Sequence, residues 1–282
     1  MNNTNTVNVI NGSSLNTVSA GITAATIAGG GATITSTNYP NSVIGNYGAV
    51  GGGIANTSAG YSVVGGGFNN FAGGFIATVA GGANNAATGD FSFAAGRRAK
   101  TQSAGAVIHN GTFAFADSTD IDFNTSVANE FAVRATGGVR FVSAVDITGI
   151  PTAGVKLAAG GGSWSSLSDR AAKRDLSGVD TLAILAKLVG MPVYTWRYRA
   201  ESSGAMHMGP VAQDFQTAFG LGDSDRHITT VDADGVALAA IQGLYQLILE
   251  KDRKIQRLEA DATRVDTLER ELATIKARMG LQ

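Results

Sequence analysis

The sequence predicts a mainly β N-terminal half that folds as a β-solenoid, followed by an α+β region that ends in a long coiled-coil helix. Three observations predict this order. Glycine-rich repeats of 14 or 15 residues occupy the stretch before residue 100. All 21 Lys and Arg and all 22 Asp and Glu residues follow residue 89, whereas 19 of the 38 glycines lie within residues 1–89. An apolar stripe with helical spacing fills the C-terminal end.

The repeats hold apolar residues at one fixed position. The segments GAVGGGIANTSAG, YSVVGGGFNNFAGG, FIATVAGGANNAATG and FSFAAGRRAK align Val50, Val64, Val79 and Ala94, and TIAGGG at 26–31 is a weaker copy. One strand per short repeat is typical of a solenoid. Glycines suit corners where coils pass closely. The recurring asparagines suit left-handed turns or side-chain amide ladders: Asn56, Asn69, Asn70, Asn84 and Asn85.

Two other interpretations of this segment are weaker. A flexible linker rarely repeats Val, Ile and Phe at fixed positions. A helix is disfavoured because each interior glycine costs about 1 kcal/mol. Since one thin coil buries little apolar surface by itself, we expect several chains to associate around an axis.

The repeats at 43–100 resemble the head of trimeric autotransporter adhesins. The resemblance implies a left-handed parallel β-roll packed as a homotrimer. The chain departs from that family because it lacks the amphipathic strands of an outer-membrane anchor. We therefore expect an adhesin-like head over 1–100 without membrane insertion.

The segment after the repeats is expected to be β-rich and then irregular. Apolar alternation and glycine turns over 101–150 predict a small β region or a continuation of the repeats. His109 stands alone there and is expected to be structural. A proline, a triple glycine and several serines predict a linker over 151–166.

The sequence SWSSLSDRAAKRDL at 163–176 combines a serine, an aspartate and a lysine. In isolation, Ser168 or Asp169 predicts the N-cap of a helix that runs through Ala171 and Ala172. Because serine and lysine are common residues, this window alone favours the capping interpretation.

A longer, ordered set of motifs favours a chemical role. SLSDRAAKRDL is followed by MPVYTWRYRAE, HMGPVAQDFQTAFGLG and HITTVDADGVALAAIQGL. Together, over about 165–250, they resemble the intramolecular chaperone domain of endosialidases and phage tail fibres. The resemblance implies a domain that trimerises the preceding fibre and then cuts itself off before the serine of the S-D motif. It implies cleavage between Leu167 and Ser168, with Ser168 and Lys173 as the catalytic pair.

The residue types fit that reaction. The Ser168 hydroxyl can attack the carbonyl of Leu167, its neighbour, to give an ester and a free α-amino group, and water then completes the hydrolysis. The base must be a neutral amine, whereas the ordinary lysine pKa is about 10.4. We expect burial at a trimer interface, aided by Arg170 and Arg174, to favour the neutral form of Lys173 and so couple cleavage to assembly.

The spacing of the two residues sets a geometric condition. On a regular helix, Lys173 would lie roughly 140° round from Ser168, too far to pair with it. Either Ser168 precedes the helix or Lys173 serves a neighbouring chain. Asp169 is expected to orient the lysine or to cap the helix. Backbone N–H groups are the expected oxyanion donors.

Other candidate sites are weaker. Asp232 and Asp234 in VDADG resemble part of a calcium loop without its third acidic residue and closing glutamate, so we expect a turn that caps the next helix. His207 lacks metal-ligand spacing and is expected to be structural or a minor neighbour of the active site. Gln213 and Asp214 resemble the family's A-Q-D motif and are expected to pack or to hydrogen-bond. We expect no metal and no cofactor.

A coiled coil is predicted over 241–282, after a chaperone and autopeptidase domain over 167–240. The stripe has one phase break and one polar exception at Lys251, and its mixed Ile and Leu residues permit three strands. Its members are Ile241, Leu244, Ile248, Ile255, Leu258, Ala262, Val265, Leu268, Leu272, Ile275 and Met279.

Composition narrows the function further. The net charge of −1 argues against a nucleic-acid partner, and the lack of cysteine excludes disulfides and thiolate chemistry. The apolar runs are too short for a membrane span, and the start MNNTNTVNVI does not resemble a secretory signal. We expect a place on a virion tail fibre or a cell surface.

The expected function is that of a trimeric fibre protein with a single-turnover, self-cleaving serine endopeptidase at its C-terminal end. The alternative is a trimeric adhesin or receptor-binding fibre that does not cut. A polysaccharide-degrading fibre is disfavoured because no carboxylate precedes Asp90 and glycoside hydrolysis ordinarily uses two. Binding of a cell-surface glycan or receptor remains open.

Overall fold

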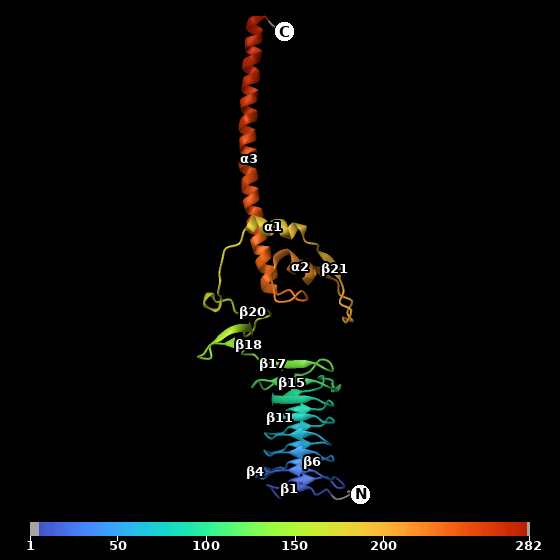
Figure 1. The fold of residues 1–282 in the computed structure, drawn as a ribbon. Coiled ribbons are helices and arrows are strands. Elements are labelled where there is room, and N and C mark those ends of the chain that lie inside the picture. The colour runs from blue at the N-terminus through green and yellow to red at the C-terminus, as the bar shows by residue number, and fades with distance from the viewer. Residues whose placement is uncertain (1–5, 281–282) are drawn as a thin grey trace. The chain divides into compact units, whose positions relative to one another are not determined.

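The computed structural model describes residues 6–280 and divides the chain into two compact units (Figure 1). The first unit is Met1–Leu167 and the second is Ser168–Gln282. The division therefore falls at the bond between Leu167 and Ser168. The finer division into five segments remains a prediction.

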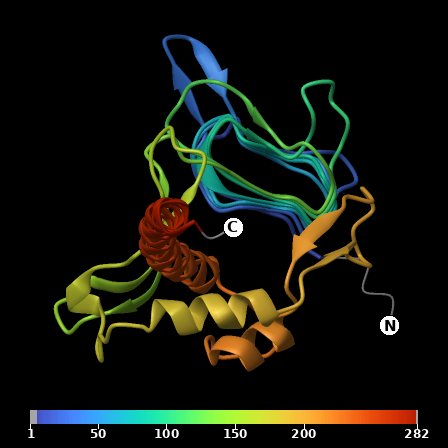
Figure 2. The same cartoon turned by 90° about the horizontal axis from the view of Figure 1, so that it is seen from above.

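The first unit contains a parallel β-solenoid of about eight turns, in which each full turn adds one strand to each of two sheets. Its coils superpose when viewed along the stack (Figure 2). The larger sheet has the order β1 (Val9–Ile10), β3 (Thr26–Ile27), β7 (Ala49–Val50), β9 (Val63–Val64), β11 (Thr78–Ala83), β13 (Phe93–Arg97), β15 (Phe113–Ala116) and β17 (Phe131–Arg134). The smaller sheet has the order β16 (Phe123–Asn124), β14 (Ala99–Lys100), β12 (Ala86–Ala87), β10 (Phe71–Ala72), β8 (Thr57–Ser58), β6 (Ser42–Val43) and β2 (Thr17–Val18). An antiparallel hairpin, β4 (Ala32–Ile34) and β5 (Thr37–Tyr39), extends one coil.

The predicted register of the repeats is confirmed. Val64 pairs with Val50 on one side and with Val79 on the other, and Val79 also pairs with Ala94. All four side chains are buried in the single apolar cluster that runs through the coils. The solenoid continues past residue 100 to the end of β17, so most of the segment 101–150 extends the same architecture. The handedness and the trimer remain predictions.

A ladder of buried asparagines joins successive coils. Asn70 is typical: its Oδ1 accepts the backbone N–H of Asn85 at 3.0 Å, and its Nδ2 donates to the carbonyls of Gly66 and Gly82 at 3.0 and 2.9 Å. These hydrogen bonds provide partners for backbone N–H and C=O groups that are buried between the coils and cannot bond to water. The ladder consists of Asn16, Asn41, Asn56, Asn70 and Asn85.

The other predicted asparagine role, in left-handed turns, is also present. Asn69 and Asn84 have φ angles of 52° and 58°, and their exposed side chains hydrogen-bond to each other at 2.8 Å. The two roles offered as alternatives are therefore divided within the repeated Asn-Asn pair. The side chain of the second member is buried in the ladder, and the first member lies in the left-handed turn.

We predict that Asn70→Ala destabilises the solenoid by about 1–3 kcal/mol for each buried group it leaves unpaired. Asn69→Gly is the matched control because glycine tolerates the positive φ and only an exposed hydrogen bond is lost. Denaturant unfolding of the full chain, followed by circular dichroism, measures both. Equal stability of the two variants would contradict the structural role of the ladder.

The first unit also contains a three-stranded antiparallel sheet. Two of its strands lie within 151–166, so the prediction of a linker over these residues was wrong. Strand β18 (Val139–Val145) pairs with β19 (Pro151–Leu157), and β19 pairs with β20 (Trp164–Ser166). The proline lies at the first position of a strand, where it is tolerated. The triple glycine belongs to the turn between β19 and β20. The proline and the glycines therefore mark a strand start and a turn of a β-meander and do not form an irregular connector.

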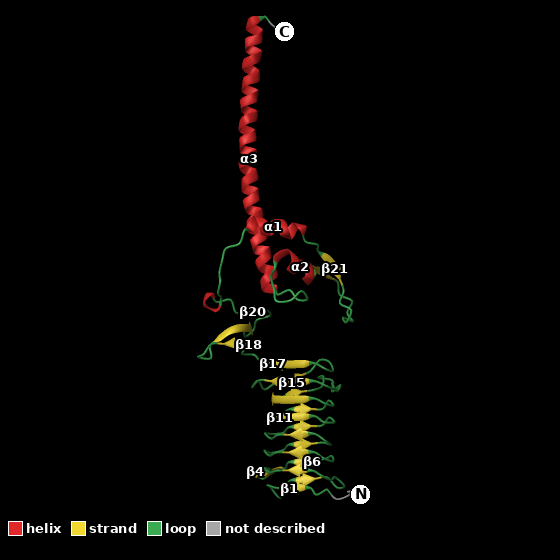
Figure 3. Ribbon diagram, in the orientation of Figure 1, coloured by secondary structure: helices red, strands yellow, loops and turns green. Residues whose placement is uncertain are grey.

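The second unit packs short elements against the start of a long helix (Figure 3). Its elements are η1 (Arg170–Ala172), α1 (Thr181–Gly190), β21 (Tyr194–Trp196), β22 (His207–Gly209), α2 (Ala212–Phe219) and α3 (Thr230–Met279). Met191, Phe215 and Val236 form the buried centre of a small apolar cluster. Gly243 lets α1 start close against α3, since a Cβ there would overlap the carbonyl of Thr181.

Helix α3 begins earlier than expected. Thr229 caps it by accepting the N–H of Asp232 at 3.1 Å, and its hydroxyl donates to the carboxylate of Asp232 at 2.8 Å. VDADG therefore lies in the first turns of the helix, which corrects the prediction of a turn before it. Farther along the helix, the apolar stripe is exposed in the part of the chain that the structure describes; Ile255 and Leu258 are 51% and 57% exposed. Among the helices of residues 6–280, none has the length and apolar character needed to cross a bilayer.

Candidate functional site

The second unit opens with a tight turn that brings Ser168 and Lys173 together. Asp169 is the N-cap of the 3-10 helix η1, and its Oδ1 accepts the N–H of Ala171 at 2.8 Å. The N–H of Lys173 then bonds to the carbonyl of Arg170 at 3.1 Å and closes the turn. As a result, Lys173 Nζ lies 2.6 Å from Ser168 Oγ.

This geometry shows how two residues five positions apart can meet, which a regular helix would not allow. Ser168 precedes the cap, and the helix is a single 3-10 turn in place of the regular helix expected through Ala171 and Ala172. A 3-10 turn has about three residues per turn, so it returns the chain sooner than an α-helix. The pair therefore forms within one chain. Asp169 takes the capping alternative, and its side chain bonds to the backbone of η1.

The surroundings of the Ser168–Lys173 pair are open to solvent. Residues 168–180 are exposed throughout. Arg174 approaches Asp175 at 3.7 Å, and both side chains are almost fully exposed, so this ion pair contributes little. In the single chain the pair is hydrated, and the turn alone supplies its alignment.

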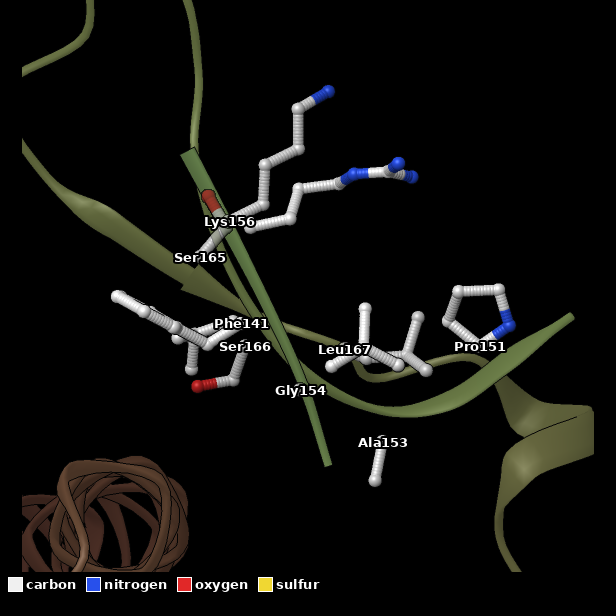
Figure 4. Close-up of a pocket in the computed structure, with 11 residues that line it drawn as sticks. Phe141, Pro151, Ala153, Gly154, Lys156, Ser165, Ser166 and Leu167 are labelled. Atoms are coloured by element: carbon white, nitrogen blue, oxygen red, sulfur yellow. The ribbon is translucent and has the colours of Figure 1, made fainter. Parts of the chain in front are cut away.

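The residue on the other side of the bond, Leu167, belongs to the first unit and continues β20. Its N–H donates to the carbonyl of Gly154 in β19 at 3.0 Å. Leu167 lies beside an open, mainly apolar groove of about 390 Å³ on the three-stranded sheet (Figure 4). Phe141, Pro151 and Val155 are among its lining residues.

Gln213 and Asp214 lie in the first turn of α2. The Asp214 carboxylate accepts a hydrogen bond from the hydroxyl of Tyr194 and, mainly through its negative charge, raises the pKa of that hydroxyl. The contact ties α2 to β21. The carbonyl of Gln213 accepts the hydroxyl of Thr217 at 2.8 Å. The predicted packing and hydrogen-bonding roles of both residues remain predictions.

His207 lies in an aromatic cluster on the hairpin β21–β22. It pairs across the hairpin with Trp196 and stacks on its indole, with ring centroids 6.2 Å apart. Its Nε2 lies 2.8 Å from Oε2 of Glu201, and this hydrogen bond lowers the pKa of the Glu201 carboxyl. Tyr198 completes the cluster at 5.0 Å from the imidazole. These contacts give His207 a structural environment.

The remaining candidates also have structural surroundings. His109 is buried, with Nδ1 2.8 Å from the hydroxyl of Thr125. Asp232 and Asp234 lie along the start of α3. Within residues 6–280, no three His, Asp or Glu side chains gather in a way that suits a metal ion.

A comparison with protein-family models matches part of the second unit. Residues 168–220 match the family described as chaperone of endosialidase. The match confirms the resemblance drawn from the motifs, and it begins at Ser168, where the second unit also begins. The name of the family also classes it among peptidases. Comparisons with curated proteins and with solved structures gave no match.

Two parts of the neighbourhood escaped the sequence reasoning. The pairing of Leu167 with β19 was hidden because proline and glycines in 151–166 suggested a linker. Glu201 was not connected with His207. The sequence does contain a hairpin pattern, in which two short β-prone runs flank a polar turn. That hairpin places Trp196 opposite His207.

We predict an acid transition at the hairpin that depends on Glu201. Because the pKa of Glu201 is lowered, its contact with His207 stabilises the hairpin above the ordinary value of 4.5 and is lost as the pH falls below it. The fluorescence of Trp196, measured in a Trp164→Phe background, should change in that range. Glu201→Gln should abolish the change; an unaltered transition in that variant would contradict the assignment.

Proposed function

We propose that the second unit assembles the preceding β-solenoid into a fibre and then separates from it by one self-cleavage between Leu167 and Ser168. The 2.6 Å approach of Lys173 Nζ to Ser168 Oγ carries this proposal. Two observations support it. The pair follows the boundary between the compact units directly, and it lies within the segment that matches the chaperone family.

The proposed reaction starts with the Ser168 hydroxyl. Lys173, as a neutral amine, accepts the hydroxyl proton while Oγ forms a bond to the carbonyl carbon of Leu167. The C–N bond to Ser168 breaks, and the proton passes to the released α-amino nitrogen. The resulting ester is hydrolysed by water, which leaves a carboxylate on Leu167 and restores the Ser168 hydroxyl. Each chain reacts once because its own peptide bond is the substrate.

The charge of the amine links the reaction to assembly. An exposed lysine is protonated near neutral pH and then donates to the serine instead of accepting its proton. Removal from water favours the neutral form. Ser168 and Lys173 are exposed in the single chain, and α3 presents an unpaired apolar stripe that suits association with other copies. Assembly into a homotrimer would cover the pair and switch on cleavage.

The released product would be the solenoid with its three-stranded sheet, on a virion tail fibre or a cell surface. One edge of the solenoid carries a row of half-exposed aromatic rings at centroid spacings of 4.7–5.9 Å. Such a row, on a segment whose one charged residue is Asp90, supports contact with a surface glycan or receptor. Its members are Tyr47, Tyr61, Phe75 and Phe91.

Substitution of either member of the pair should stop the cleavage. We expect wild-type protein to yield a fragment that begins at Ser168, whereas Ser168→Ala, Lys173→Ala and Lys173→Arg remain at 28.7 kDa. Ser177→Ala and Lys187→Ala are matched controls that should cleave normally. Intact mass and N-terminal sequencing measure the products. A wild-type chain that stays whole after assembly would support the alternative of a non-cleaving structural fibre.

Disruption of the apolar stripe should slow cleavage without touching the pair. Ile248→Asp combined with Ile255→Asp should weaken assembly and lower the cleavage rate by at least about tenfold, since the amine stays hydrated. Gln246→Asp combined with Gln256→Asp adds the same charge to the outer face of α3 and should leave both unchanged. Sedimentation and gel assays follow assembly and cleavage. Normal cleavage by the monomer would contradict the coupling.

A further inference from the structure

We propose that strand β19 is a positioning element for the self-cleavage, because it holds the residues before the scissile bond as a paired β-strand. This inference rests on the proposed function. It adds a requirement from the first unit: the acyl side of the bond must be fixed by its pairing with Gly154. Residues of the three-stranded sheet thus become specificity determinants of a reaction whose nucleophile lies in the second unit.

The pairing extends up to the bond itself. Trp164 pairs with Leu157, Ser165 with Lys156 and Ser166 with Val155. The N–H of Leu167 then donates to the carbonyl of Gly154 at 3.0 Å. The last residue before Ser168 is therefore held by the same ladder as β20. This holds the amide of Leu167 and limits how far the backbone before the scissile bond can move.

The sheet also provides a place for the side chain of Leu167. Gly154, its partner across the strands, has no side chain, and the groove beside it is lined by Phe141, Pro151 and Val155 (Figure 4). Gly154 is required for a second reason. Its φ is 145°, and a Cβ there would overlap the carbonyl of Phe141 in β18. The groove is therefore a consequence of close strand packing, and it suits a medium-sized apolar residue.

The register of β20 is fixed from its other end. The rings of Trp164 and Phe141 are 5.6 Å apart, and a turn closed by the N–H of Gly161 on the carbonyl of Ala158 precedes the strand. A slip by one residue would move every side chain to the opposite face. The sheet thus holds Leu167 at one defined position, directly beside its covalent neighbour Ser168.

Fixing the carbonyl matters because the attack occurs between adjacent residues. The Ser168 hydroxyl reaches the Leu167 carbonyl only in a narrow range of backbone angles, and loss of alignment in such reactions costs rate steeply. A paired Leu167 removes part of that search before the base acts. The predicted effect is on the cleavage rate and not on the identity of the nucleophile.

Two insertions of a single glycine test the proposal in the full chain. Insertion between Ser166 and Leu167 leaves the catalytic turn intact but moves Leu167 off Gly154, and it should lower the cleavage rate by at least about tenfold. Insertion between Ser177 and Gly178 lengthens the exposed segment after the catalytic turn and preserves the pairing. It should cleave within about twofold of wild type. Leu167→Gln should also be slow because the groove is apolar.

The outcomes separate this inference from the proposed function. If wild-type protein does not cleave, the self-cleavage itself is wrong. If wild type cleaves and Ser168→Ala does not, but both glycine insertions cleave at the wild-type rate, the positioning role of β19 is wrong. Circular dichroism and sedimentation of each variant show that the solenoid and the assembly are retained.

Discussion

The proposed self-cleavage depends on a single turn of 3-10 helix that brings Ser168 and Lys173 together. Five positions separate Ser168 from Lys173, and a regular helix would point them in different directions. Asp169 caps a tighter turn instead, and the returning chain brings the amine to 2.6 Å from the hydroxyl. The aspartate thus acts through the backbone. Because the turn is local, the two side chains are aligned within one chain, and both residues are exposed there.

The two units are stabilised by different interactions. This difference is consistent with the proposal that the second unit assembles the solenoid and then separates from it. The solenoid has a narrow core of small apolar residues and relies on buried asparagine side chains to satisfy the backbone between coils. The second unit has a small apolar cluster and a long helix whose apolar stripe is exposed within the described residues 6–280. A unit of that kind gains stability from association.

The sequence predicted the repeated parts best because repetition reports register directly. The spacing of Val50, Val64 and Val79 corresponds to a row of buried, paired residues. The sequence offered turns or ladders for the asparagines, and the structure has one member of each Asn-Asn pair in each role. The linker prediction over 151–166 failed because proline and glycine mark strand ends and turns as well as irregular chain. The capping role of Asp169 was one of two alternatives that residue types cannot separate, since the same carboxylate suits a lysine and a backbone N–H.

The most direct test of the central claim is to trap the ester on Ser168. Assembly of the protein in hydroxylamine should yield first-unit fragments that end in a Leu167 hydroxamate, detected by mass spectrometry, because an ester is open to that nucleophile and an amide is not. This result is expected of wild type and not of Ser168→Ala. Fragments that end only in a free carboxylate, or cutting at the same bond in Ser168→Ala, would contradict the account.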